Sequence, residues 1–454
     1  MKVLIDYPNI VSVALIPMII AIFALGFPLL IQTITRIDDK YNSTRLIEAF
    51  KKEKITRLFL LSLFSAVLSY IVWFLQLPSL FNRCWIIDNS ALFILLISTF
   101  ALIISTFLIG YITYIYYVPE KLVNHLVRLY KSTKKENFRT FYFEAISKIL
   151  FYSIDKADET LARTLLQFYH EAFILFRKGK EEQSIEYPQE YYDAIFEANE
   201  LLCCRKKKTI SYFNDSTLFY LLLDEYQKTV ISSKTYNFLW KLIVQSVFYN
   251  RMDFIIAYWE KAHQLFSLFM PKIYPDYDYS STPLIIKNQK AIDKREKERE
   301  DFLEFHYVLG ALLMYKKEYS VIREIMYYTH SQPPRYVFVP ERLEEVILQY
   351  MQVGRNDYFQ PFYYRQKYWF PDIHGVNTDD VIKMWIKRYL AILFIRQYTL
   401  HEYYIHSNAL SMPRVPQELS ELNRWKEELD SLKYYVNEYL EDTEMLKALG
   451  LEHL

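Results

Sequence analysis

The chain has 454 residues, of which 52% are hydrophobic and 24% are charged, and its formal net charge at pH 7 is +1. This near-neutral balance lacks the basic field that drives sequence-independent binding of nucleic acids. The seven glycines all stand apart from one another, which excludes the glycine-rich phosphate loops of P-loop enzymes and dinucleotide-binding folds. The three cysteines do not make a disulfide framework, so we expect a reducing compartment around the water-facing part of the chain.

Three long stretches near the N-terminus contain no Asp, Glu, Lys, Arg or His. They cover residues 7–35, 58–82 and 89–119. Each is longer than the ~20 apolar residues that a helix needs to cross a bilayer core of ~30 Å. We therefore predict transmembrane helices at about residues 10–32, 58–80 and 91–117.

Charge divides the chain near residue 118. Residues 1–118 contain nine of the 54 Lys and Arg and six of the 53 Asp and Glu, a net charge of +3, which leaves the remainder at −2. This division predicts a membrane domain at 1–118 and a cytoplasmic, all-helical domain at 119–454.

Positive charge sets the orientation, because short loops rich in Lys and Arg stay in the cytoplasm. Seven such residues lie between the first and second spans, Arg83 alone follows the second, and five more follow the third by residue 135. We expect the N-terminus outside and the C-terminal domain in the cytoplasm. Abundant Tyr, Phe, Ile and Lys with little Gly are typical of A+T-rich bacterial genomes, which favours the bacterial inner membrane.

The loop between the first two spans is expected to contain a short helix. Asn42 or Ser43 would cap it, with Leu46, Ile47 and Phe50 on one side and basic residues elsewhere. Such a helix fits two positions, either on the anionic inner leaflet or packed under the cytoplasmic domain.

Two spans carry small or hydroxylated side chains at helical spacing. These residues are Thr99, Thr106, Gly110 and Thr113 in the third span and Ser62, Ala66 and Ser69 in the second. Helices in lipid associate through close backbone approach and hydroxyl hydrogen bonds, so these stripes predict packing contacts within the chain or between copies. A polar pore lining in an oligomer is the alternative. No Asp, Glu, Lys, Arg or His lies inside a span, whereas ion and proton carriers usually need one.

Behind Pro119 the apolar residues recur at helical spacing, which predicts an all-α domain. One amphipathic helix is expected at 161–176, and two helical hairpins are expected, turning at 250–251 and at 316–318. The two turns are about 67 residues apart, close to two periods of a helical repeat of about 34 residues. Such hairpins can stack as a loose solenoid that offers a groove to a peptide or a protein.

The last helix has apolar residues at the alternating spacing of three and four that is typical of a coiled-coil seam. The seam residues are Leu422, Trp425, Leu429, Leu432, Val436 and Tyr439. A seam needs a partner, either a second copy of the chain or another helix of the same domain. Together with the stripes in the spans, it predicts a homo-oligomer.

Metal chemistry finds little support in the sequence. His401 and His406 are five residues apart, whereas the helical zinc-protease site needs a spacing of four. The adjacent Cys203 and Cys204 lack spaced partners and precede four basic residues, which would repel a cation. We expect no metal, no cofactor and no requirement for catalysis.

One pattern resembles a known class of enzymes. Arg396 and His401, with the polar Gln397 after the arginine, are similar to the Arg and His that HEPN ribonucleases place four to six residues apart on one helix. Three further pairs have six residues between Arg and His, which is within the same range: Arg163 with His170, Arg299 with His306 and Arg323 with His330. The resemblance implies a helical ribonuclease in which Arg396, Gln397 and His401 are catalytic.

These features predict an integral inner-membrane protein whose cytoplasmic helical domain is an interaction or sensing module, so that the chain acts as a membrane-anchored scaffold or receptor. The expected partners are the lipid bilayer, a protein bound by the cytoplasmic domain, and further copies of the chain. Two alternatives are a pore-forming or membrane-perturbing effector of a stress or phage-defence response, and a membrane-tethered HEPN-like ribonuclease.

Overall fold

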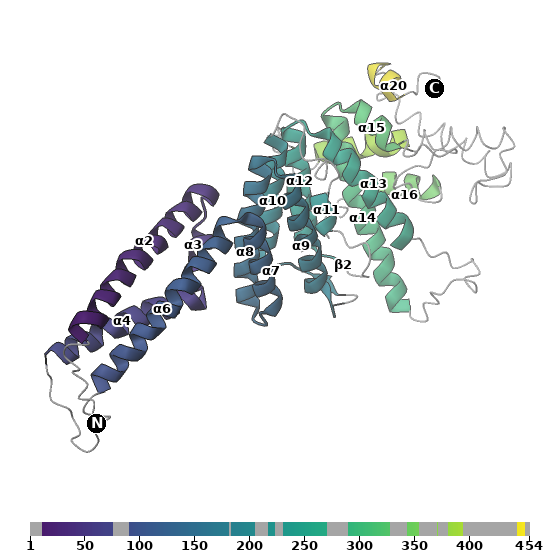
Figure 1. Ribbon diagram of the computed structural model, residues 1–454. Helices are drawn as coiled ribbons and strands as arrows, with labels where there is room; N and C mark the ends of the chain where they lie inside the picture. The colour runs from purple at the N-terminus through teal and green to yellow at the C-terminus, as the bar shows by residue number, and fades with distance from the viewer. Residues whose placement is uncertain are drawn as a thin grey trace, which may run out of the picture. The chain divides into compact units, whose positions relative to one another are not determined.

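The structure, a computed structural model, describes residues 11–75, 90–180, 183–204, 217–222, 230–269, 289–326, 343–353, 370, 380–393 and 443–449. Over these residues the protein is helical apart from short connections and one two-stranded sheet, which confirms the predicted all-α class (Figure 1). The chain forms two compact units. The first unit contains Met1–Tyr169 and Pro188–Ala198, and the second contains His170–Tyr187 and Asn199–Leu454. Residue 118 lies inside the first unit, and the predicted division of the chain at that point stays a prediction.

Within the described residues, three helices are long and apolar enough to cross a membrane. They are α2 (Ile16–Tyr41), which follows a π-helical turn at Val11–Leu15, α4 (Lys54–Phe74) and α6 (Ser90–Tyr117). They confirm the three predicted spans and make the chain a membrane protein.

The spans differ from the predicted limits at their polar ends. The prediction ended the first span near residue 32, whereas α2 continues through the polar turn from Arg36 to Lys40 and ends at Tyr41. Likewise α4 begins at Lys54, four residues before the predicted start. Lys and Arg are good helix formers, so charge limits only the part of a helix that enters hydrocarbon and not the helix itself. Asn42, with a φ of 44°, closes α2 in the left-handed conformation that Asn tolerates.

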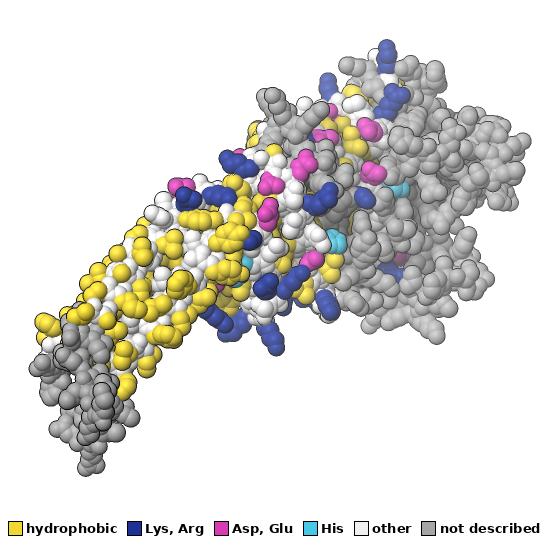
Figure 2. All heavy atoms as spheres, viewed as in Figure 1, with side chains coloured by type: hydrophobic (Ala, Val, Ile, Leu, Met, Phe, Trp, Pro, Cys, Tyr) yellow, Lys and Arg dark blue, Asp and Glu magenta, His cyan; other side chains and the backbone are white. Residues whose placement is uncertain are grey.

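The third span, α6, is the centre of the bundle and packs against both α4 and α2. Each span buries one face and exposes bulky apolar side chains on the other, for example Leu25 at 72%, Phe64 at 70% and Phe107 at 79% exposure. Figure 2 shows the result as an almost continuous hydrophobic surface over these helices. A surface of this extent is unfavourable in water and favourable in lipid.

The first unit also contains α3 (Thr44–Lys52), α7 (Pro119–Ser132), α8 (Glu136–Lys156) and parts of α9 (Glu159–Arg177) and α10 (Gln189–Cys204). Both α3 and α7 pack against α8. The ring of Phe143 stacks on that of Tyr191 with centroids 3.7 Å apart, and the hydroxyls of Tyr130 and Tyr191 are 2.7 Å apart. Tyr169 donates a hydrogen bond of 2.6 Å to Ser147 Oγ. Aromatic side chains therefore form the core of this part, and the helix predicted at 161–176 is confirmed within α9.

The second unit contains the remaining parts of α9 and α10 and most of the later helices. Its other elements are β1 (Ser184–Ile185), α11 (Thr217–Leu222), β2 (Val230–Ile231), α12 (Ser233–Phe248), α13 (Met252–Phe269), α14 (Gln289–Tyr315), α15 (Tyr319–Met326), α16 (Leu343–Val353) and α20 (Thr443–Leu449). Residues 380–393 are helical as well. The strands β1 and β2 are parallel, with Ser184 opposite Val230.

Both predicted helical hairpins are present in the described residues. The α12–α13 turn contains Asn250 with a φ of 56°, and the α14–α15 turn contains Lys317 with a φ of 57°. The charged segment before Phe302 is continuous with the first helix of the second hairpin, so that α14 has 27 residues. A repeat or solenoid arrangement stays a prediction.

Candidate functional site

The short helix α3 lies where the spans meet the other helices of the first unit. Its N-terminus is capped by Ser43, whose Oγ accepts a hydrogen bond of 3.2 Å from the Leu46 N–H. Leu46, Ala49 and Phe50 form its buried face, and α3 contacts α2, α4 and α8. Of the two positions that the sequence left open for this helix, the contact with α8 corresponds to packing against the helical region. We call α3, the break at Glu53, the end of α6, and the helices α7 and α8 the junction.

Glu53 separates α3 from α4, and its carboxylate joins two further helices. Its Oε1 accepts a hydrogen bond of 3.1 Å from the Tyr116 hydroxyl at the end of α6 and lies 2.8 Å from His125 Nε2 in α7. Because a carboxylate only accepts, His125 Nε2 carries the shared proton. The side chains of Glu53 and His125 are 11% and 19% exposed, so the contact is largely shielded from water. Phe50 packs against the Tyr116 ring at 5.1 Å and completes the cluster.

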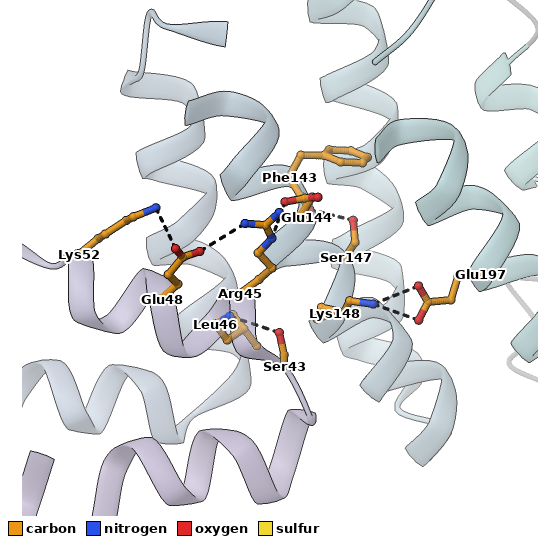
Figure 3. A network of polar contacts seen from close by, with 10 residues as sticks. All are labelled: Ser43, Arg45, Leu46, Glu48, Lys52, Phe143, Glu144, Ser147, Lys148 and Glu197. Carbon is orange, nitrogen blue, oxygen red and sulfur yellow. Dashed lines mark hydrogen bonds and ion pairs between the residues drawn. The ribbon is translucent and has the colours of Figure 1, made fainter. Parts of the chain in front are cut away.

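One ion pair connects α3 to α8, and two more within α3 extend it (Figure 3). Arg45 Nε lies 2.9 Å from Glu144 Oε2 in α8, and Arg45 Nη1 lies 3.3 Å from Glu48 Oε2. Glu48 also pairs with Lys52 at 3.7 Å. Burial raises the pKa of Glu144, and the charge of Arg45 opposes this rise. Such half-exposed pairs contribute at most about 1 kcal/mol each, so their main effect is to fix which turn of α3 faces α8.

The end of α2 is held to the junction by Lys40. The Lys40 ammonium lies 5.3 Å from the ring centre of Tyr41 and 5.4 Å from that of Tyr152 in α8. The two rings meet edge to face at 5.0 Å. Lys40 Nζ also donates a hydrogen bond of 3.3 Å to the backbone oxygen of Tyr117. The C-terminal ends of α2, α6 and α8 therefore meet around one cation.

The residues predicted to pack the spans or line a pore lie in two environments. Ser62, Ala66 and Ser69 in α4, and Thr99 and Thr113 in α6, are buried within the bundle.

The other two members of the stripe in α6 are more open. Thr106 is half-buried, and Gly110 is exposed, with no atom within 4 Å of the place where a Cβ would stand. The stripe therefore divides between the interior of the bundle and its outer surface. Its role in packing between copies or in a pore stays a prediction.

Several hydroxyl groups inside the bundle pair with one another or with the backbone. The Oγ1 atoms of Thr33 in α2 and Thr113 in α6 are 3.2 Å apart. Ser98 in α6 donates a hydrogen bond of 2.9 Å to Ser65 in α4, and Thr99 donates one of 2.7 Å to the carbonyl one turn earlier. These bonds supply the partners that lipid does not offer to a polar group.

The candidate ribonuclease residues Arg396, Gln397 and His401 lie outside the described residues. The coiled-coil positions at 422–439 lie outside them as well. Both predictions therefore stay as the sequence left them.

Two histidines of the recurring Arg and His spacing are described: His170 is exposed on α9, as is Arg163, and His306 is part of the buried core. His306 is fully buried, its Nδ1 lies 2.6 Å from the Phe302 carbonyl oxygen, and its Nε2 lies 2.9 Å from the Tyr258 hydroxyl. Since a carbonyl only accepts, Nδ1 carries the hydrogen, and the lone pair of Nε2 accepts from Tyr258. Burial lowers the pKa of His306 to about 3, so the ring is neutral. Both ring nitrogens are occupied, which leaves this histidine unsuited to acid–base chemistry on RNA.

Sequence reasoning missed the residues that hold the junction together. Glu53 and His125 are 72 residues apart, and Thr33 and Thr113 are 80 residues apart, so no local spacing indicates either pair. The one local signal is that Glu53 is an isolated carboxylate within a basic run from Lys51 to Lys54.

Among the described residues, no group of three or more His, Cys, Asp or Glu side chains is placed to hold a metal ion. No protein-family model matches this chain, and comparison with curated proteins and with solved structures gives no match either. The function must therefore be argued from the membrane spans and the junction.

Proposed function

We propose that this chain is a membrane-anchored scaffold or receptor, whose helical region beyond the spans binds a protein partner and is mechanically coupled to the membrane. The observation that carries this proposal is the junction. A simple anchor needs only one span and a flexible linker, whereas here Val118 alone separates α6 from α7. The hydrogen bonds of Glu53 and the ion pair between Arg45 and Glu144 tie the first unit together on both sides of that link.

We place the junction on the cytoplasmic side of the bacterial inner membrane, with the N-terminus outside. The excess of positive charge at this end of the spans supports the orientation. The cations that contribute to it on and between α2 and α4 are Arg36, Lys40, Arg45, Lys51, Lys52, Lys54 and Arg57. The amino-acid composition supports a bacterial origin.

Self-association is part of the proposal. The open surface at Gly110 and the half-buried Thr106 support close approach of a helix from a second copy, because small residues let backbones meet in lipid. The apolar spacing at 422–439 supports a further contact between copies.

The first experiment is capture of partners by the tagged full-length chain in mild detergent, followed by mass measurement of the complex. We expect a stoichiometric protein partner and more than one copy of the chain. Recovery of a monomer that carries only lipid would contradict the proposal. A C-terminal tag that external protease removes from spheroplasts would contradict the orientation, and an N-terminal tag serves as the accessible control.

The two alternatives give distinct results with the same purified protein. Liposomes that contain the chain should show no ion flux, and flux that disappears when Thr106 and Gly110 are changed to Leu would favour a pore. RNA cleavage that is lost in His401→Ala would favour the ribonuclease. Neither activity is expected of a scaffold.

A further inference from the structure

The cations at the junction fall into two groups. Arg45 and Lys52 form ion pairs with the carboxylates of Glu48 and Glu144, so their charges are already compensated. In contrast, Arg36 and Lys121 have no carboxylate within ion-pair distance among the described residues. Their charges are therefore available to an anion from outside the chain.

Two tyrosines hold these uncompensated cations in place. The Arg36 guanidinium carbon lies 5.0 Å from the ring centre of Tyr117. Lys121 Nζ lies 4.1 Å from the ring centre of Tyr114 and donates a hydrogen bond of 2.7 Å to its hydroxyl. Because Tyr114 and Tyr117 are three residues apart in α6, one helical turn positions both cations. An aromatic ring attracts a cation without neutralising it, so the positive charge persists.

A third cation, Lys40, lies one turn after Arg36 on α2 and donates to the backbone oxygen of the same Tyr117. The carboxylate of Glu120, next to Lys121 in the sequence, acts on Lys40 through its charge. Arg36, Lys40 and Lys121 thus bring three cations together, and none of them forms an ion pair with Asp38, Asp39 or Glu120 in the described part of the chain. We call Arg36, Lys40, Tyr114, Tyr117 and Lys121 the basic corner.

The basic corner lies at the depth where the hydrophobic surface ends. Ile31, which is 49% exposed, precedes Arg36 by little more than one turn on α2, and the exposed Tyr111 precedes Tyr114 on α6. Figure 2 shows dark blue side chains gathered where the yellow surface of the spans stops. Lipid phosphates lie at this depth, and Tyr is enriched there because its ring is amphipathic. Cations that have no ion-pair partner of their own attract the anionic headgroup of a lipid.

We propose that the basic corner binds the phosphate of an anionic glycerophospholipid in the leaflet next to the junction, and that it makes the protein selective for anionic lipid. The proposal rests on insertion of the spans, but it does not depend on the protein partner. Loss of lipid selectivity and loss of partner capture are therefore separate results.

The test is to count lipids retained by the full-length protein in detergent, by native mass spectrometry, after addition of phosphatidylglycerol or phosphatidylcholine. We expect preferential retention of phosphatidylglycerol. In the double variant Arg36→Gln with Lys121→Gln, its affinity should fall about fivefold for each cation removed. The matched control, Lys51→Gln with Lys54→Gln, removes the same charge from exposed positions outside the corner and should bind as the wild type does.

Three results would overturn the proposal: equal retention of the two lipids, unchanged affinity in the double variant, or displacement of phosphatidylglycerol by inorganic phosphate, which would assign the corner to a free anion. The charge-conserving variant Arg36→Lys with Lys121→Arg guards against misfolding. It keeps both charges, so it should retain the lipid, and its failure to do so while still folded would also overturn the proposal.

Discussion

Two helices of this chain, α6 and α9, each expose the side chains that suit the surrounding solvent, which is hydrocarbon for α6 and water for α9. In α9 the exposed positions include Arg163 and Gln167, and the buried ones include Leu165. In α6 the exposed positions include Phe107, and the buried ones include Ser105. Each helix turns outward the side chains that its surroundings accept, water for α9 and hydrocarbon for α6. The polarity of the exposed face, more than that of the interior, distinguishes the spans from the other helices.

The interiors of the two regions also differ in their buried polar groups. The spans bury hydroxyls, which are neutral at every pH that a cell meets. The described part of the second unit buries His306, and its α14 also contains Asp301, so these two groups make its stability depend on pH below neutrality. Acid should therefore act on the second unit and leave the bundle of spans unchanged.

The largest effect is expected from a charge on the outer face of α6. Phe107→Lys puts an ammonium where the side chain is 79% exposed to lipid, at a cost of about 3 kcal/mol near the membrane centre. The membrane-inserted fraction should fall strongly, as measured by carbonate extraction of membranes. Gln167→Lys on the exposed face of α9 is the control and should insert normally. If both variants insert alike, the assignment of α6 to lipid is wrong.

A smaller effect is expected where α2 meets α4. A Cβ at Gly26 would lie 2.8 Å from the Phe59 ring, so Gly26→Leu should force the helices apart and destabilise the bundle by about 1–3 kcal/mol. Gly110→Leu, which meets open space, should leave the same stability unchanged. Unfolding of the bundle in a denaturing-detergent titration measures both. Equal destabilisation by the two substitutions would contradict this packing.

The pH dependence of α14 has two opposing parts. The pKa of His306 falls to about 3 on burial, so the unfolded chain takes up this proton first and stability is lost as pH falls from about 6.5 towards 3. Burial raises the pKa of Asp301 to about 7, so the folded chain takes up that proton first and stability increases as pH falls below about 7. In the wild-type protein the two effects oppose each other.

The substitution Asp301→Asn should therefore remove the opposing effect and leave the pH dependence that is due to His306. In this variant the free energy of unfolding of α14 should be about 1.4 kcal/mol lower at pH 5.5 than at pH 7.5, because pH 5.5 is one unit below the unfolded pKa of His306. Amide hydrogen exchange in α14 measures the change, with the wild type as the reference of smaller slope. A variant with no pH dependence in this window would rule out a buried neutral His306.

The smallest effect concerns a hydroxyl pair between spans. Ser98→Ala removes the hydrogen bond to Ser65 and should destabilise the bundle by about 0.6 kcal/mol, the average for such bonds in membranes. Ser65→Ala should cost the same, and the double variant should cost no more than either single change. Additive losses in this cycle would show that the two hydroxyls act independently.

Sequence alone predicted the elements whose signal is local. The spans follow from charge-free length, and the face of α9 that contains Leu161, Leu165 and Phe168 follows from apolar spacing. The two hairpin turns follow from interruptions in that spacing. In each case the residues that carry the signal lie within one helix or one turn, where period and length decide the structure.

The junction could not be predicted in this way. The contact of Gly26 with Phe59 and the contact of Glu53 with His125 each join different helices. Helical period says which residues share a face, but not which face meets which, and that choice depends on the packing of the whole unit. The basic corner could not be predicted either, because the loop sequence shows seven cations but does not show that carboxylates of Glu48 and Glu144 pair with Arg45 and Lys52.

The single-residue link at Val118 has a mechanical consequence. Bilayers of different thickness change the tilt of the helices that cross them. Only Val118 separates α6 from α7, and Tyr116 in α6 and His125 in α7 form hydrogen bonds to the same carboxylate of Glu53. A change in the tilt of α6 should therefore change the orientation of α7 as well. Stretching or thinning of the lipid would then be transmitted from the spans to α7 as a change in the angle of that helix.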